Sequence, residues 1–268
     1  MNFRVDIIIV GDSKSGHDIL DKVATGRATR KVAFISKTFK SNTTHDYVNV
    51  TYFNDEVVYL SYRHSLFCCY TKNGDHIYGT HLVMAPGLNY EPFIVNNEPV
   101  PCVFNSVDDV AKSAKDQPAL VICKSEADVK LAIDVAKKYK QVYACTDAVS
   151  LHENVSAATA RKLAKVENLV ILTNTNIKSV TANNGILQRV EFDNYSEVSC
   201  SAIFVQTAAK PALEFVPRKI LDRAGDYPVV TEGCESTIVP RCFVVGSCLT
   251  NYNKAMEQAV VDSIIKDF

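Results

Sequence analysis

Residues 11–16 have the residue types and the spacing of a phosphate-binding turn. The segment Gly-Asp-Ser-Lys-Ser-Gly keeps the outer glycines of the G-x-G-x-x-G pattern, Gly11 and Gly16, and has Ser13 in the middle position. In such a turn, glycines allow a tight bend and let backbone N–H groups approach a pyrophosphate at the start of a helix. The side chain of Ser13 intrudes on that approach, and any strand-to-helix turn favours Gly, Asp and Ser. The loop alone is consistent with a dinucleotide site and with a plain structural turn.

The position that should bind the ribose of such a ligand carries unexpected residue types. Units of this kind place an Asp or Glu at the end of the strand that follows the helix, where it accepts a hydrogen bond from a ribose hydroxyl. The strand over residues 31–36 is followed at that point by Ser36 and Lys37. This departure weakens the interpretation of the loop as a dinucleotide site.

A second strand-loop-helix segment, over residues 123–128, lacks every glycine of the pattern. The three glycine positions carry Cys123, Ser125 and Asp128, and Glu126 adds a second carboxylate. Both carboxylates fall where an anionic pyrophosphate would bind, so charge repulsion would weaken its binding. The residues after the next strand, Thr-Asp-Ala-Val-Ser, include no arginine that would neutralise a 2′-phosphate. We therefore predict that this loop does not bind NAD(P)H.

The elements around the two loops predict an α/β fold. Around the first loop, the runs VDIIIVG, HDILDKVATG and KVAFIS predict a strand, a helix and a strand, and the continuous apolar strands indicate a buried parallel sheet. The runs ALVICK, SEADVKLAIDVAKKY and QVYAC repeat this order around the second loop. Short alternating runs follow each unit, within residues 47–84 and around a turn at 183–185, and predict small antiparallel inserts.

The chain is therefore expected to contain two Rossmann-like, FAD/NAD(P)-binding units, built on parallel sheets with small antiparallel β inserts. The last strand and helix, after residue 227, would return the chain to one of the two sheets. The expected division is an FAD-binding-like domain over residues 1–113 and 213–268, and a degenerate NAD(P)-binding-like domain over residues 114–212.

Composition limits the partners and the compartment. With 29 basic and 30 acidic side chains among 268 residues, and no long basic run, the chain lacks the charge pattern of a nucleic-acid-binding protein. It shows neither a signal-peptide pattern nor an apolar stretch long enough to span a membrane, so we expect a cytoplasmic protein without a membrane partner.

Cysteine and histidine spacing gives no clear catalyst. Nine cysteines lie scattered through strand-like runs, without a C-x-x-C motif, and indicate reduced, buried thiols. Cys68 and Cys69 are adjacent, so in a strand they point to opposite faces. A redox role for these two and for Cys248 stays open. No Cys/His spacing typical of zinc occurs, so no metal site is predicted.

In its order of segments, the chain resembles the pyridine-nucleotide disulfide oxidoreductases, the family of thioredoxin reductase and NADH oxidase. IIIVGDSKSG resembles the flavin-binding loop, and HLVMAPGLNYEP resembles the strand that closes over the flavin. CESTIVPRCFVVGSC resembles the strand that ends near the ribityl chain, and YNKAMEQAVVDS resembles the final helix, under the isoalloxazine ring. Members of this family are commonly dimers, so the resemblance also implies a homodimer.

The resemblance implies an FAD site built from both ends of the chain. The loop would hold the FAD pyrophosphate, the end of the next strand would lie near the adenosine ribose, and the last strand and helix would approach the ribityl chain and the ring. The implied positions are Gly11, Ser13, Gly16, Ser36, Lys37, Ala85, Gly87, Gly246, Ser247 and Ala255.

The departures from the family pattern leave two hypotheses open. The usual Ala-Thr-Gly is Ala-Pro-Gly at residues 85–87, the usual Gly-Asp is Gly-Ser at 246–247, and the redox C-x-x-C is missing. One hypothesis is a divergent thioredoxin-reductase-like flavoprotein that binds FAD but not NAD(P)H and takes electrons from a protein donor. The alternative is a non-catalytic pseudoenzyme of the same fold that acts as a protein-binding or assembly module.

Overall fold

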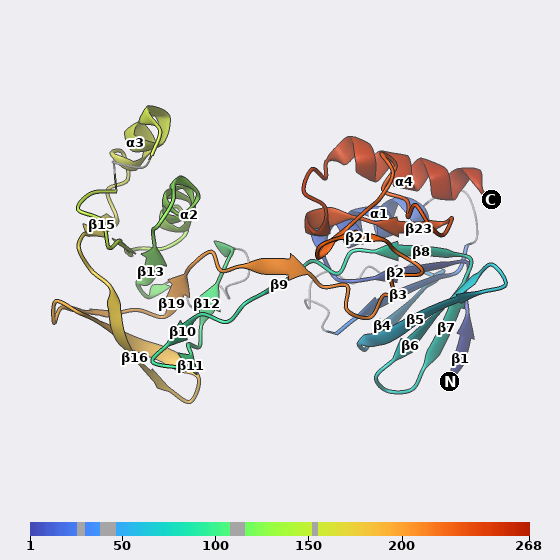
Figure 1. Ribbon diagram of the computed structural model, residues 1–268, viewed down its shortest axis with the longest axis horizontal. Coiled ribbons are helices and arrows are strands. Elements are labelled where there is room, and N and C mark those ends of the chain that lie inside the picture. Colours follow the sequence, from blue (N-terminus) through green and yellow to red (C-terminus); the bar gives the residue numbers. More distant parts are fainter. Residues whose placement is uncertain (26–29, 38–46, 108–115, 152–154) are drawn as a thin grey trace. The chain divides into compact units, whose positions relative to one another are not determined.

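The computed structural model describes residues 1–25, 30–37, 47–107, 116–151 and 155–268. It divides the chain into two compact units, which are coloured by sequence in Figure 1. Unit 1 consists of Met1–Asn89 and Ala209–Phe268, and unit 2 consists of Tyr90–Ala208. The predicted boundary at residue 113 lies outside the described residues.

Unit 1 is built around a parallel sheet with the strand order β23-β8-β2-β3-β4. All four pairings are parallel, as the continuous apolar strands predict. The described strands are β2 (Ile7–Val10), β3 (Val32–Ser36), β4 (Val50–Asn54), β8 (His81–Met84) and β23 (Cys242–Val244).

Strand β4 corrects the expectation that the short runs from Tyr47 onward form an antiparallel insert before the chain returns to the sheet. It pairs in parallel with β3, from Val32 opposite Val50 to Ser36 opposite Asn54. Its side chains contact both cores of the unit, because Val50 packs on the helix side and Phe53 is buried on the other side. Burial on two faces places a strand within a layered sheet, which a pattern of local alternation does not reveal.

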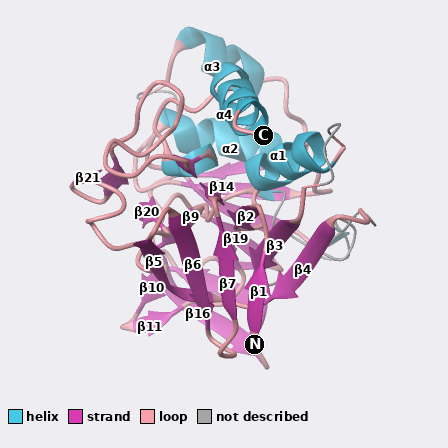
Figure 2. Cartoon of the chain, turned by 90° about the vertical axis from the view of Figure 1, so that its right-hand side faces the viewer, coloured by secondary structure: helices cyan, strands magenta, loops and turns pink. Residues whose placement is uncertain are grey.

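Helices cover one face of this sheet and a smaller sheet covers the other (Figures 1 and 2). The helices are α1 (Lys14–Ala24) and α4 (Lys254–Lys266), and the smaller sheet has the order β1-β7-β6-β5. Its strands are β1 (Asn2–Arg4), β5 (Val57–Arg63), β6 (Leu66–Thr71) and β7 (His76–Gly79). Strands β5 to β7 form the expected antiparallel insert, and β1 adds a parallel edge strand that the sequence did not predict.

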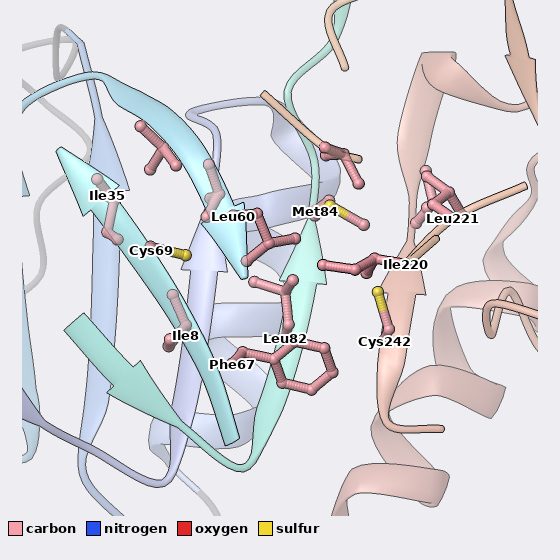
Figure 3. Packing of buried hydrophobic residues seen from close by; sticks show 14 of the residues in the cluster. Ile8, Ile35, Leu60, Phe67, Cys69, Leu82, Met84, Ile220, Leu221 and Cys242 are labelled. Atoms are coloured by element: carbon pink, nitrogen blue, oxygen red, sulfur yellow. The ribbon is translucent and has the colours of Figure 1, made fainter. Parts of the chain in front are cut away.

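Alternation along the central strands separates the two cores. On β2, Ile7 and Ile9 face the helices, whereas Ile8 faces the smaller sheet. Figure 3 shows the second core, in which Ile8 packs in one cluster with Leu60 and Phe67 of the smaller sheet. These side chains are fully buried. Both faces of the sheet are therefore covered, and its strand ends are left for a ligand. Parallel α/β sheets bind ligands at the edge that the carboxyl ends of their strands form.

Unit 2 repeats the plan. Its parallel sheet has the order β12-β19-β13-β14-β15, with two helices on one face and an antiparallel meander on the other. The sheet strands are β12 (Val103–Phe104), β13 (Ala119–Ile122), β14 (Val142–Cys145), β15 (Leu169–Leu172) and β19 (Ala202–Phe204). The helices are α2 (Glu126–Ala136) and α3 (Ala157–Leu163), and the meander is β16 (Ile177–Asn183), β17 (Ile186–Phe192) and β18 (Glu197–Ser199). The predicted α/β class with two Rossmann-like units is confirmed.

Residues 90–107 belong to unit 2, although the sequence grouped them with the first domain. The reason is that β12 pairs in parallel with β19 and so extends the second sheet. Short ribbons complete the chain: β9 (Leu88–Tyr90) pairs with β20 (Ala209–Pro211), β10 (Ile94–Val95) with β11 (Glu98–Pro99), and β21 (Arg223–Ala224) with β22 (Tyr227–Pro228). No helix in the described part of the chain combines the length and apolar character that a membrane crossing requires.

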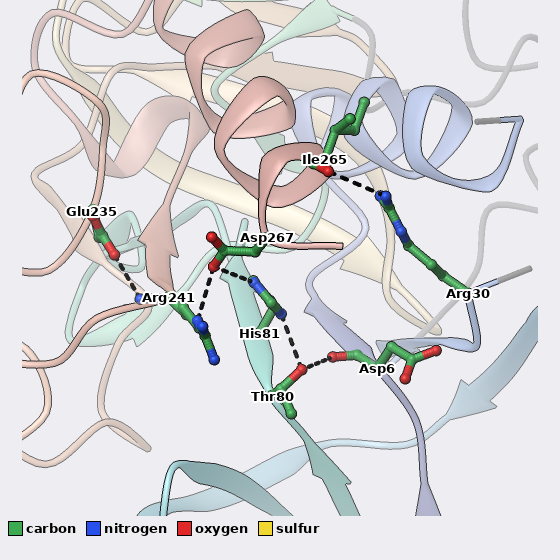
Figure 4. A network of polar contacts seen from close by, with 8 residues as sticks. All are labelled: Asp6, Arg30, Thr80, His81, Glu235, Arg241, Ile265 and Asp267. Atoms are coloured by element: carbon green, nitrogen blue, oxygen red, sulfur yellow. Dashed lines mark hydrogen bonds and ion pairs between the residues drawn. The ribbon is translucent and has the colours of Figure 1, made fainter. Parts of the chain in front are cut away.

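A buried histidine ties the end of α4 to the sheet of unit 1 (Figure 4). His81 is only 2% exposed; its Nδ1 lies 3.0 Å from the Thr80 hydroxyl and its Nε2 lies 3.1 Å from the Asp267 carboxylate. Arg241 donates to the same carboxylate at 2.8 Å. Burial lowers the pKa of His81, and the nearby Arg241 lowers it further, against the opposing effect of Asp267.

Acid should therefore weaken unit 1 through His81. Its pKa is lower in the folded chain than the ordinary 6.5, so the folded state binds fewer protons than the unfolded state. Stability from this group is present above the ordinary pKa and is lost as the pH falls below it. We expect the melting temperature of His81→Gln to depend less steeply on pH between about 7 and 5 than that of the wild type. His64→Gln, which removes an exposed imidazole, should keep the wild-type slope; equal slopes for all three proteins would contradict this role.

Candidate functional site

The first loop crosses the end of β8 so closely that its outer glycines are required. Gly11 has a φ of +109°, and a Cβ atom there would lie 2.2 Å from the carbonyl oxygen of Ala85. A Cβ atom on Gly16 would lie 2.6 Å from the carbonyl oxygen of Gly11. The two glycines that the sequence retains therefore allow β2, the loop and α1 to pack against one another.

The start of α1 presents backbone donors that the protein itself does not use. Ser13 is the N-cap residue and its hydroxyl accepts a hydrogen bond from the Gly16 N–H at 3.3 Å. Within the described residues, the N–H groups of Lys14 and Ser15 have no acceptor. The serine at the middle position thus turns back to cap the helix, and two donors at the positive helix end are left for an anion or for water.

Gly11, Asp12 and Ser13 of this loop line a cavity of about 610 Å³ that lies entirely in unit 1. Its wall is formed by the loop after β2, the end of β3, the turn after β4, and the segments that follow β8 and β20. Of the predicted site residues, the wall includes Gly11, Ser13, Ser36, Lys37 and Gly87. The structure therefore brings together residues of the loop, the ribose position and the strand that resembles the flavin-closing strand.

Charged side chains in this wall are mostly paired. Asp12 forms a short contact with Nε2 of His17 on α1. Lys37 Nζ lies 2.5 Å from Glu56 Oε1, and both line the cavity. Glu56 was not predicted from the sequence, since it lies twenty residues along the chain from Ser36 and belongs to a turn without any motif. Only the pairing of β3 with β4 brings it to the site.

In the second loop, the carboxylate of Asp128 accepts the N–H groups that precede the helix. Asp128 Oδ2 accepts hydrogen bonds from the N–H groups of Lys124 and Ser125, at 3.0 and 2.8 Å, and from the Ser125 hydroxyl at 2.7 Å. Ser125 in turn caps α2, which completes a capping box. Glu126 accepts hydrogen bonds from the hydroxyls of Thr159 and Ser156, which lower its pKa to about 2. A carboxylate of the chain therefore occupies two N–H groups of the turn before α2, beside a cavity of only about 50 Å³.

Comparison with known proteins gives the family. Residues 37–246 match the pyridine nucleotide-disulphide oxidoreductase family. The chain belongs to this family. No curated protein matches the sequence. The first loop precedes the matched residues, so its assignment rests on its geometry.

Solved thioredoxin reductases have the same fold as this member of the pyridine nucleotide-disulphide oxidoreductases. The T. acidophilum enzyme is 15% identical, with a TM-score of 0.70 and 98% of each chain covered. The Lactococcus lactis enzyme, in its FR conformation, is 16% identical, with a TM-score of 0.64 and coverage of 97% of this chain and 95% of that one. The Streptococcus pyogenes enzyme is 15% identical, with a TM-score of 0.60 and full coverage of both chains. At identities this low, the structural similarity shows a common fold and nothing further.

The other site residues that the family resemblance implied lie in different surroundings. Ala85 and Gly246 are buried, and a Cβ atom on Gly246 would lie 3.2 Å from the Ser15 hydroxyl, so this glycine packs against the first loop. Ser247 and Ala255 are exposed and do not line the cavity. Their roles near a ribityl chain and a flavin ring stay predictions.

The thiols of this family member lie in apolar surroundings. All nine cysteines are free, and all except the half-buried Cys102 are buried. Cys248 donates to the Gly87 carbonyl at 3.2 Å, and burial raises its pKa to about 11. Burial also raises the pKa of Cys68 and Cys69. Thiols with raised pKa values stay protonated at neutral pH and are poor nucleophiles.

Substitution of Gly11 tests the close crossing of the loop. Gly11→Ala adds both a positive-φ strain and a clash with backbone, so we expect it to lower the free energy of unfolding by about 3 kcal/mol or more. Gly74→Ala is the matched control, since Gly74 has a φ of +87° with nothing within 4 Å of its Cβ position. It should cost only about 1 kcal/mol. Similar losses for both variants in urea unfolding would show that the crossing is not tight.

Substitution of Asp128 tests the capped second loop. Asp128→Ala leaves two N–H groups without their acceptor, so we expect a loss of about 1–3 kcal/mol in the free energy of unfolding. The control Asp134→Ala, on the exposed face of the same helix, should change it by less than about 0.5 kcal/mol. Circular dichroism during urea titration measures both, and equal effects would contradict the capping role.

Proposed function

We propose that this chain is a flavoprotein oxidoreductase that binds FAD in the cavity of unit 1. The observation that carries the proposal is the 610 Å³ cavity at the carboxyl edge of the sheet, which the first loop lines through Gly11 and Ser13, directly before the start of α1. Membership of the pyridine nucleotide-disulphide oxidoreductases and the thioredoxin reductase fold support it. The combination favours a ligand with a pyrophosphate and an adenosine, as FAD has.

The residues of this site fit the ADP portion of FAD. Gly11 and Ser13 line the cavity, and the N–H groups of Lys14 and Ser15, at the start of α1, would supply donors to a pyrophosphate. Ser36 and Lys37, at the end of β3, would lie near the ribose. When bound, FAD would supply hydride and single-electron transfer. The part of this chain is to bind the nucleotide and to orient it at the carboxyl edge of the sheet.

The proposed flavoprotein does not take electrons directly from NADPH. The support for this step is Asp128, which already accepts the N–H groups of the second loop and carries a negative charge where a pyrophosphate would have to bind. The chain also lacks a C-x-x-C dithiol motif, and the raised pKa of the Cys248 thiol does not favour thiol chemistry beside Gly87. We therefore propose that the electron donor is another protein. We also propose that this chain acts as a homodimer in the cytoplasm.

A second candidate is a non-catalytic fold that serves as a protein-binding or assembly module. The charge of the cavity wall favours it, because among the described lining residues the carboxylates of Asp12, Asp55, Glu56 and Glu214 outnumber the single ammonium of Lys37. Neighbouring carboxylates weaken the binding of an anionic ligand.

An absorption spectrum and a ligand titration separate the two candidates. For the flavoprotein, the purified chain shows flavin bands, or added FAD raises the melting temperature of the colourless chain. FAD at 100 times its Kd would stabilise the native state by about 2.7 kcal/mol. NADPH at the same concentration serves as the control and should give no shift. A colourless protein that FAD does not stabilise would refute the FAD proposal and leave the non-catalytic module.

A further inference from the structure

The ribose position of the unit 1 cavity lacks the carboxylate that units of this kind usually carry on their own second strand. Strand β3 ends at Ser36 and is followed by Lys37. Without a carboxylate at this position, a ribose 2′-hydroxyl would lose its usual charged acceptor, and a cation there would instead attract a 2′-phosphate. Considered alone, this strand end would favour a 2′-phosphorylated nucleotide.

The neighbouring strand brings a carboxylate to the same place. Strand β4 runs parallel to β3, with Ser36 opposite Asn54, so both strands end at the same edge of the sheet. The Asp55 N–H then donates to the Ser36 carbonyl at 2.8 Å, which fixes the turn beside the strand end. Glu56 follows in that turn, and its Oε1 lies 2.5 Å from Lys37 Nζ.

Glu56 and Asp55 differ in whether their carboxylate oxygens already accept hydrogen bonds from the chain. Asp55 uses both oxygens, since Oδ1 accepts the Glu56 N–H at 2.7 Å and Oδ2 accepts the Asn73 N–H at 3.1 Å. The second oxygen of Glu56, Oε2, has no donor within the described part of the chain, and the side chain is 34% exposed in the cavity wall. Asp55 therefore holds the turn, and Glu56 keeps a free acceptor.

We infer that Glu56, oriented by Lys37, accepts the ribose 2′-hydroxyl of the bound adenine nucleotide and excludes a 2′-phosphate. The inference rests on the proposed nucleotide site in unit 1. The pairing engages Lys37, the one cation that the described residues place at the ribose position, so among these residues a 2′-phosphate would meet the carboxylates of Glu56 and Asp55 without a free positive charge. The acid of the ribose position has thus moved from the end of β3 to the turn after β4.

Calorimetric titration with ADP and with its 2′-phosphorylated counterpart tests this inference. For the wild type we expect ADP to bind about tenfold tighter than the 2′-phosphorylated form. Glu56→Gln removes the charge and releases Lys37, so the ratio of the two affinities should shift by about tenfold toward the 2′-phosphorylated form. Lys37 is exposed and Glu56 is half-buried, so the variant should fold normally, which its melting temperature checks.

A second ligand and a control variant complete the test. In the wild type, 2′-deoxy-ADP should bind about tenfold more weakly than ADP, and Glu56→Ala should abolish that difference. Glu232→Gln removes an exposed glutamate of unit 1 outside the cavity wall and should keep both wild-type ratios. If the wild type binds ADP but Glu56→Gln keeps the wild-type ratio, the inference fails and the proposed site stands. If the wild type binds neither ADP nor FAD, the proposed function fails as well.

Discussion

The first N–H groups of a helix have no acceptor within that helix, and among the described residues the first two N–H groups of both α1 and α2 have none. The two units differ in the turn that leads into the helix. In unit 2, Asp128 turns back and accepts the N–H groups of Lys124 and Ser125, which precede the helix. In unit 1, Gly16 occupies the position that corresponds to Asp128 and has no side chain that could accept them. A carboxylate therefore lies in the turn before α2, at a position where the turn before α1 has a glycine.

The packing of unit 1 holds the first loop, residues 11–16, in place. The crossing of Gly11 under the Ala85 carbonyl requires β2 and β8 to be neighbours, and their parallel pairing provides this. The smaller sheet and the helices bury both faces of that pairing, so the loop rests on a packed support. The cavity then forms at the carboxyl edge, where side chains from β3 and from the turn after β4 meet. The position of the cavity follows from the layer architecture.

The two units also show how a fold persists while its sites diverge. Unit 2 keeps the parallel sheet, the crossover helix and the meander of unit 1, yet its loop has become a capping box. A capping box stabilises the helix start without any ligand. The raised pKa of Cys248 likewise makes that thiol a stable packing group at the edge of the site. Fold and family are therefore better defined by this structure than reaction and substrate.

The sequence by itself determined the α/β class, the two βαβ units, the weakened first loop and the loss of glycine from the second. These depend on hydrophobic periodicity and on residue type at fixed spacing, which are local properties of the chain. Only the tertiary structure decided that β4 joins the parallel sheet, that β12 belongs to unit 2, and that Glu56 lies against Lys37. Strand pairing over many residues sets these contacts, so no local pattern contains them. The direction of the Ser13 and Asp128 side chains was also decided there, because the same residue type can cap a helix or face a ligand depending on what its neighbours leave unsatisfied.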